Sequence, residues 1–270
     1  MPKSRILRGS AGVLVRCAAA LIATTSLCQA PRQTSEIKKP LIYQIGQYLH
    51  INASGPRPLL QAVEAVQGKY GWVLDYEDPE YTTAPGGAAS RPSPPHHLHS
   101  YAAGADAGDG FSLQFNVGAD PNIPPDQQKF LTALVDAYNQ SAGTAQFKLL
   151  KQQHNSFAIV GVAVQGANEQ MIAQQPVLDL PITLVRASRN TADAIAAICH
   201  QVSRQSKLPI SIHLAANASP SATAVIGGSA VPARELLSQA LATMGDKAYW
   251  QLLYDGQNKS YDLDIKELSQ

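Results

Sequence analysis

Cysteine is scarce in this sequence, and most of it lies near one end. Two of the three cysteines, Cys17 and Cys28, occur within the first thirty residues. Without that region a single thiol remains, which excludes an intramolecular disulfide. That thiol, Cys199, falls on a helical stripe with three apolar residues, Ile195, Ile198 and Val202. The stripe predicts that Cys199 packs in a core and is not a reactive thiol.

Motifs that carry chemistry are missing as well. The chain has no His-Glu-x-x-His, no Gly-x-Ser-x-Gly, no phosphate-binding glycine loop and no Cys-x-x-Cys. The usual sequence signals of metalloproteases, serine hydrolases, nucleotide-binding proteins and disulfide oxidoreductases are therefore absent. We predict a protein that is not an enzyme, with no catalytic, cofactor-binding or metal-binding residues. A hydrolase stays open as an alternative if His200 or His213 meets a carboxylate and a nucleophile.

Two short patterns have both a functional and a structural interpretation. His96, His97 and His99 offer imidazoles to a metal, but their Pro- and Ser-rich segment has no scaffold to fix the geometry, so we predict a solvated loop. The run Gly68-Lys69-Tyr70-Gly71 matches the Gly-x-x-Gly of RNA-binding KH domains. Because it joins a helix to a strand, not two helices, we predict a helix cap there.

Two clusters complete the candidates. Acidic residues gather where a predicted strand ends, at Asp75, Glu77, Asp78 and Glu80. They lack the spacing and the glycine turn of a calcium loop, so we predict a solvated turn. Aromatic residues gather in the last two strands, at Tyr249, Trp250, Tyr254 and Tyr261. We predict that core packing accounts for most of these rings, with a binding platform as the alternative.

The first thirty residues have the pattern of a secretory signal peptide. Basic residues come first, without an acidic one, at Lys3, Arg5, Arg8 and Arg16. An apolar run from Cys17 to Ala23 and small residues up to Ala30 follow. That run is too short to span a bilayer, so we predict removal of residues 1–30 and a periplasmic or secreted protein. A lipid anchor on Cys28 is the alternative, which Leu27 disfavours because a lipoprotein signal needs a small residue there.

Positive charge is not in excess beyond the signal. Four of the 21 Lys and Arg residues lie in it, leaving 17 against 20 acidic residues, a net charge of −3. A mildly acidic chain lacks the electrostatic surface that binds nucleic acid, so no nucleic-acid partner is predicted. No later segment is apolar over a length that spans a membrane, and no transmembrane span is predicted.

The second half of the chain has a regular order of predicted elements. A strand at 182–185 precedes a helix opened by Asn190 with Asp193 three residues on, which is typical of a capping box. Further strands are predicted at 210–214 and 223–226, then a helix from Pro232 to Gly245. Two strands, at 249–254 and 261–265, end the chain. The order is β-α-β-β-α-β-β.

The first half repeats this order. Strands are predicted at 49–51, 72–76, 111–117, 147–150 and 157–160, with helices after Pro58 and after Pro124-Pro125. Residues 82–110 are rich in Ala, Gly, Pro and Ser and are predicted to be a disordered insertion. Residues 165–177 suit a linker. We therefore predict an α+β fold of two tandem small domains, 41–164 and 178–270, each with two helices packed on small sheets.

The repeated unit resembles the secretin and TonB receptor N-terminal domain. The match is best over Ala233 to Ile265, where Glu235-Leu236-Leu237-Ser238-Gln239-Ala240-Leu241 precedes Trp250-Gln251-Leu252 and Tyr261-Asp262-Leu263. It covers most of 178–265 and, more weakly, 48–164. The resemblance implies a periplasmic domain that contacts other proteins near an outer-membrane pore or receptor. The family has no catalytic residues, so none carry over.

The expected function is an exported, non-enzymatic protein–protein interaction module of the cell envelope. The resemblance extends this expectation to an association with a secretin- or TonB-type system. Small open sheets have free edge strands, and an edge accepts a partner strand through backbone hydrogen bonds without any special side chain. Other envelope proteins are the expected partners. The alternatives are an envelope hydrolase and a protein that binds peptidoglycan or another glycan. Exposed aromatic side chains on one face would favour the glycan-binding protein.

Overall fold

The computed structural model describes residues 41–54, 57–81, 110–118, 120, 123–141, 144–152, 156–166, 168–214 and 222–268. The predicted signal peptide, residues 1–30, and all of the predicted insertion except Gly110 lie outside these described residues.

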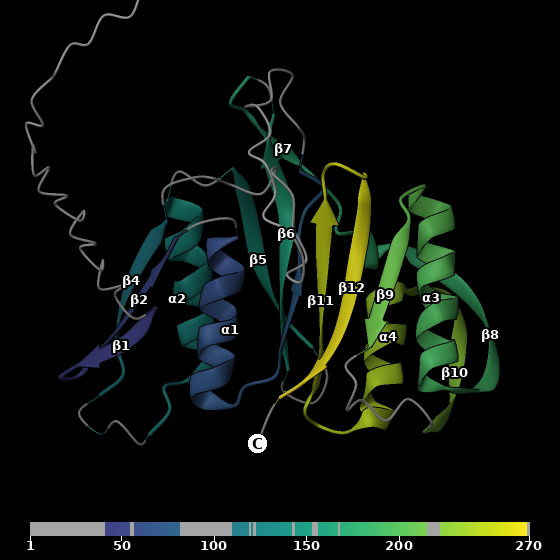
Figure 1. Ribbon diagram of the computed structural model, residues 1–270, viewed down its shortest axis with the longest axis horizontal. Coiled ribbons are helices and arrows are strands. Elements are labelled where there is room, and N and C mark those ends of the chain that lie inside the picture. The colour runs from purple at the N-terminus through teal and green to yellow at the C-terminus, as the bar shows by residue number, and fades with distance from the viewer. Residues whose placement is uncertain are drawn as a thin grey trace, which may run out of the picture. The chain divides into compact units, whose positions relative to one another are not determined.

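The described residues form helices and strands in an α+β arrangement, which confirms the predicted fold class (Figure 1). The first half consists of β1 (Ile42–Ile45), β2 (Tyr48–Ala53), α1 (Pro58–Tyr70), β3 (Leu74–Glu77), β4 (Phe111–Asn116), α2 (Gln127–Gln140), β5 (Ala145–Lys151) and β6 (Phe157–Gln165). The strand β7 (Met171–Ala173) and the short helix η2 (Val177–Asp179) follow. The second half consists of β8 (Pro181–Asn190), α3 (Thr191–Ser206), β9 (Ile210–Leu214), β10 (Thr223–Pro232), α4 (Ala233–Leu241), η3 (Ala242–Met244), β11 (Ala248–Asp255) and β12 (Ser260–Glu267).

The two halves use the same strand pairings. In the first half β2 pairs antiparallel with β4, β3 pairs parallel with β6, and β5 pairs antiparallel with β6. In the second half β8 pairs antiparallel with β10, β9 pairs parallel with β12, and β11 pairs antiparallel with β12. Every strand of the second half therefore has an equivalent in the first: β8 corresponds to β2, β10 to β4, β9 to β3, β11 to β5 and β12 to β6.

Strands of both halves join in one long sheet. Its order is β5-β6-β3-β11-β12-β9, with β7 added on β6, which makes seven strands (Figure 1). The halves meet where β3 pairs in parallel with β11, at Tyr76 opposite Gln251 and Glu77 opposite Leu252. The buried side chains of the two halves form a single cluster. Within the segment predicted as a linker, β7 pairs with the end of β6.

The helices of the two halves lie on opposite faces of the long sheet. Tyr76 stacks on Phe147 and so faces α1 and α2, and its neighbour across the junction, Gln251, donates a hydrogen bond to Glu64 of α1 at 3.1 Å. Adjacent residues of a strand point to opposite faces. Trp250 therefore points the other way, where Arg234 of α4 lies over its ring at 5.3 Å from the centroid.

Helix ends follow from local chemistry. Asn190 caps α3 by accepting the Asp193 N–H at 2.7 Å, as the capping-box pattern predicts. Asp126 caps α2 by accepting the Lys129 N–H at 2.8 Å. Gly71 ends α1 in the left-handed conformation at φ 67° and donates its N–H to Gln67 O. The Gly-x-x-Gly at 68–71 is thus the end of a helix, as the cap interpretation predicts.

Several strands differ from the sequence expectation: β6 runs to Gln165, β8 runs to Asn190, and β7 lies in the segment predicted as a linker. β1 was not predicted, and it pairs with β2 beyond a turn at Gly46. β10 runs to Pro232 instead of stopping at 226, because register shifts on both sides of Gly228 let the strand bend and continue. A Cβ atom on Gly227 would lie 2.6 Å from Leu184 O, so this bend needs glycine.

Candidate functional site

The acidic cluster is buried. Asp75, Glu77 and Asp78 are 5, 0 and 1 % exposed, whereas Glu80 is exposed. The prediction of a solvated turn is therefore wrong for three of the four residues. It failed because β3 is an interior strand with β6 on one side and β11 on the other, and the sequence of one half gives no sign of the second neighbour. The cluster marks the junction between the halves.

Asp78 forms a buried ion pair with Arg57, which lies just before α1. Arg57 Nε donates to Asp78 Oδ2 at 2.7 Å, and Arg57 Nη2 donates to Tyr254 O on β11, also at 2.7 Å. The Tyr254 N–H donates to the same carboxylate oxygen at 3.1 Å. Burial raises the pKa of Asp78 and the Arg57 guanidinium opposes that shift. Arg57 has φ 78°, an uncommon conformation for a residue other than glycine, which these contacts hold in place.

Glu77 forms the second buried group. Arg234 Nη2, from α4, donates to Glu77 Oε2, and Arg234 Nε donates to Asp179 Oδ1 at 2.9 Å. The Leu178 N–H donates to Glu77 Oε1 at 3.2 Å. Burial raises the pKa of Glu77, against the effect of Arg234. These contacts tie β3 to η2 and to α4, so both ion pairs serve the joining of the halves.

Asp75 is the least compensated of the three carboxylates. Its Oδ1 accepts the Trp250 N–H at 3.0 Å. Burial raises its pKa to about 7, an effect that the Trp250 N–H and the charge of Arg234 only partly offset. Asp75 lies on the wall of a cavity of about 630 Å³ with Trp72, Gln152, Ser238 and other residues of both halves. A carboxyl with a pKa of about 7 changes its charge near neutral pH, whereas an ordinary Asp is fully ionised there.

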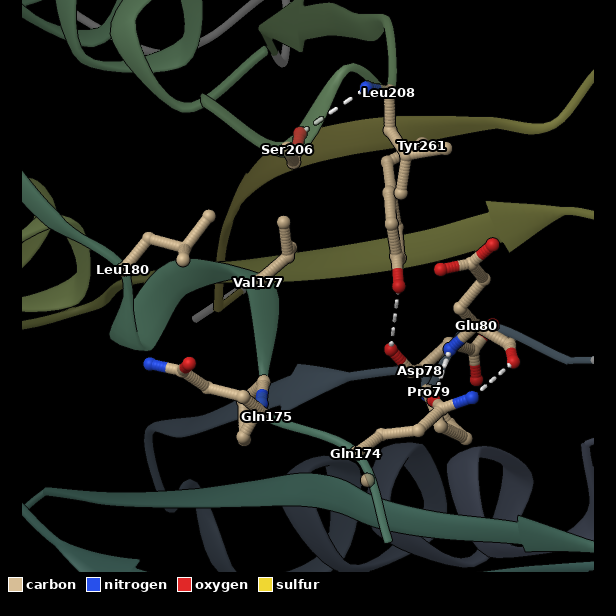
Figure 2. Close-up of a pocket in the computed structure, with 12 residues that line it drawn as sticks. Asp78, Pro79, Glu80, Gln174, Gln175, Val177, Leu180, Ser206, Leu208 and Tyr261 are labelled. Atoms are coloured by element: carbon tan, nitrogen blue, oxygen red, sulfur yellow. Dashed lines mark hydrogen bonds between the residues drawn. The ribbon is translucent and has the colours of Figure 1, made fainter. Parts of the chain in front are cut away.

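A smaller cavity, of about 270 Å³, lies where the end of β3 approaches η2 and β12. Figure 2 shows the Tyr261 hydroxyl pointing at the carbonyl of Asp78, 3.5 Å away. The Gln174 side chain donates to Glu80 O at 2.7 Å and accepts from Glu80 N at 2.9 Å, as a strand would. These polar groups bond one another, so they hold the β6–η2 connection against β3.

The remaining candidates from the sequence are distributed over the structure. Cys199 is 2 % exposed and burial raises its pKa to about 12, which confirms the prediction of a core thiol. Trp250, Tyr254 and Tyr261 are buried, as core packing predicts. His200 is exposed on α3, and His213 Nε2 lies 3.7 Å from Asp262 Oδ1 on the surface of β9 and β12. His96, His97 and His99 lie outside the described residues.

The long sheet ends in two strands that pair on one side only among the described strands, β5 and β9. We call their outer sides the open edges, and β3 and β11 the joined edges. Asn139 of α2 covers one position of the β5 edge, because its amide donates to Phe147 O at 2.8 Å and accepts from Phe147 N at 2.9 Å. The sequence analysis missed Asn139, whose role depends on a contact between a helix and a strand edge.

No group of His, Cys, Asp and Glu side chains within the described ranges is arranged to hold a metal ion. Among the helices of the described residues, none has both the length and the apolar character needed to cross a membrane. Comparisons with protein-family models, with curated proteins and with solved structures find no match to this chain.

Proposed function

We propose that this chain is a non-enzymatic protein–protein interaction module of the cell envelope, exported by its N-terminal signal, that binds partners along the open edges of its long sheet. The observation that carries the proposal is the pair of strands, β5 and β9, at the ends of one sheet. An edge strand offers backbone N–H and C=O groups in a fixed row, which a partner strand matches without a special side chain. An association with a secretin- or TonB-type system belongs to the same proposal.

Two features support edge binding over a glycan-binding surface. Among the large apolar side chains that are exposed in the described residues, Tyr48 is the one aromatic, whereas a glycan-binding face is expected to present several exposed rings. The pairing of β3 with β11 shows two strand edges of this fold in contact through their backbones. The equivalent strands, β9 and β5, carry the open edges.

The proposal is tested by capture from an envelope extract of the source cells with the exported chain as bait. A variant Ile212→Pro blocks the β9 edge, and Leu149→Pro blocks the β5 edge. We expect the wild-type chain and a surface control, Val185→Asp on β8, to retain a partner that at least one edge variant loses. Equal capture by all four folded chains, or none by any, would contradict the proposal.

A further inference from the structure

The junction pairs two kinds of strand edge, and each kind occurs twice in the chain. In the repeated pairing scheme β9 is the equivalent of β3, and β5 is the equivalent of β11. β3 and β11 are joined to each other, whereas among the described strands β9 and β5 each have a neighbour on one side only. We propose that a second copy of this chain fills the open edges, with β9 of one molecule in parallel pairing with β5 of the next.

This proposal rests on the proposed function and names its partner. The strand register specifies the contact. Leu74 pairs with Phe157, the first residue of β6, and Ile210 pairs with its equivalent Tyr261, so Ile212 corresponds to Tyr76. By the same comparison of the antiparallel pairs, Lys148 corresponds to Gln251. Because Tyr76 lies opposite Gln251 at the junction, Ile212 of one molecule lies opposite Lys148 of the other.

The backbone N–H and C=O groups at the outer side of β9 are oriented for this parallel pairing. The Tyr261 N–H donates to Pro209 O at 2.8 Å. In a parallel ladder alternate residues bond to the same neighbour, so Ser211 and His213 face β12, while Ile212 and Leu214 direct their N–H and C=O groups outward. At the junction Asp78 is the equivalent of Leu214. Its N–H points outward from β3 and donates to Leu252 O of β11 at 2.9 Å.

The β5 edge is already prepared at its first outward residue. At the junction the Trp250 N–H is satisfied by a side chain, the Asp75 carboxylate, at 3.0 Å, and backbone pairing begins further along β11. Phe147 is the equivalent of Trp250, and Asn139 of the same molecule accepts its N–H at 2.9 Å and donates to its carbonyl at 2.8 Å. The incoming strand therefore needs no acidic residue there. β9 has Ser211 at the position equivalent to Asp75. A carbonyl oxygen has two lone pairs, so Phe147 O keeps one for the N–H of an incoming Ile212.

The groove beside β5 also corresponds to an occupied site at the junction. The buried residues of α2 and α4 have the same spacing, from Phe130 and from Leu236, so Gln128 is the equivalent of Arg234. Arg234 receives Glu77 of β3. Gln128 instead lines a groove of about 310 Å³ with Lys148, Leu149 and Lys151 of β5. In the proposed contact this groove receives His213, the equivalent of Glu77.

A pair of Gln128 with His213 lacks the charge pairing of Arg234 with Glu77, so the contact between molecules is weaker than the junction and reversible. It is also heterologous, because different surfaces of the two molecules meet. Such a contact does not close in a dimer, and chains add head to tail into rings or open rows.

Sedimentation equilibrium of the exported chain tests the proposal. We expect the wild-type mass to rise with concentration beyond that of a dimer. Ile212→Pro and Leu149→Pro each remove an outward N–H and leave the inner ladder intact, so each variant alone is expected to stay monomeric. An equimolar mixture still has one intact edge of each kind and is expected to form a dimer and nothing larger. Val185→Asp should assemble like the wild-type chain.

A disulfide measurement covers the case in which a proline variant does not fold by circular dichroism. With Cys28 replaced by Ser, an Ile212→Cys chain mixed with a Lys148→Cys chain should form a linked heterodimer. Ile212→Cys mixed with Val185→Cys should not. Cys199 does not compete, because it is buried and its pKa is about 12.

A wild-type chain that stays monomeric up to millimolar concentration, assembly of Ile212→Pro alone, or no heterodimer from the matched cysteine chains would overturn self-pairing. A monomeric wild-type chain that still captures an envelope partner, and loses it in Ile212→Pro, would overturn self-pairing and leave the proposed function standing.

Discussion

β3 and β9 occupy the same place in the two halves but have opposite chemistry. β3 is closed on both sides and carries carboxylates, each bonded to a backbone N–H or an arginine of a neighbouring element. Within the part of the chain that the structure describes, β9 pairs on one side and carries Ser211 and His213, with the His213 side chain 47 % exposed. A buried charge requires a fixed partner, whereas residues at an open edge must tolerate water. The side chains thus suit β3 to a permanent contact inside the sheet and β9 to an edge that remains accessible to a partner strand.

The largest expected effect comes from removing the cation of a buried ion pair at the junction, Arg57 with Asp78. Arg57→Ala removes the Arg57 donors from Asp78 Oδ2 and from Tyr254 O, and leaves the buried Asp78 carboxylate with the Tyr254 N–H but without its cation. We expect the free energy of unfolding to fall by about 3–5 kcal/mol, as for other broken buried pairs. Urea unfolding measures it. The exposed pair of Lys266 with Glu64 is the matched control, and Lys266→Ala should cost about 0–1 kcal/mol. Similar losses in both variants would remove the distinction between joined and exposed pairs.

Equivalent positions in the two halves give the next comparison. Glu77→Ala removes the acceptor of the Arg234 guanidinium and of the Leu178 N–H and leaves both donors buried without it, so we expect a loss of about 2–3 kcal/mol in the free energy of unfolding. His213→Ala, at the equivalent position of β9, should change it by about 0.5 kcal/mol or less, because the side chain is half exposed. Both values come from the same denaturant titrations. An equal cost at both positions would mean that burial does not separate the two strands.

Asp75 makes the stability of the junction depend on pH. Its pKa is about 7 in the folded chain against an ordinary value of 3.8, so the folded state binds the proton more tightly. The contribution of Asp75 to stability is therefore fully present below about pH 4 and is lost as the pH rises from about 4 to 7, by at most about 1.4 kcal/mol per pH unit. The raised pKa values of Glu77 and Asp78 act with the same sign.

Asp75→Asn should reduce this slope without abolishing it. The asparagine oxygen still accepts the Trp250 N–H, and no charge has to be buried at pH 8. We expect the variant to match the wild-type chain near pH 4 and to exceed its stability at pH 8 by about 1–3 kcal/mol, within the range that a shift of this size permits. Urea midpoints at the two pH values measure it. A variant that is less stable than the wild-type chain at pH 8 would show that the charge of Asp75 is well compensated.

The sequence predicted the local elements better than their assembly. Periodicity located α3 and β12, and the Asn190 cap formed as expected, because these features depend on residues close together in the chain. The burial of Glu77 depends on Arg234, 157 positions further along, and on a strand pairing that no local pattern reveals. The carboxylates of a strand that is buried on both faces were therefore predicted to lie in a solvated turn. The open edges depend on the same pairing, since one cannot know which strand is outermost before the sheet is assembled.

The smallest effect concerns the preparation of the β5 edge. Asn139→Ala removes the two hydrogen bonds to Phe147 and exposes its backbone to water, not to an apolar interior, so we expect a loss of about 1 kcal/mol in the free energy of unfolding. Because Ser211 of an incoming β9 does not replace the lost acceptor, self-association should weaken together with stability. Asn139→Asp keeps an acceptor for the Phe147 N–H and should restore most of the association. Sedimentation of both variants checks this order. An Asn139→Ala chain that assembles more strongly than the wild-type chain would show that the amide blocks the β5 edge, and that Asn139 and Asp75 are not equivalent.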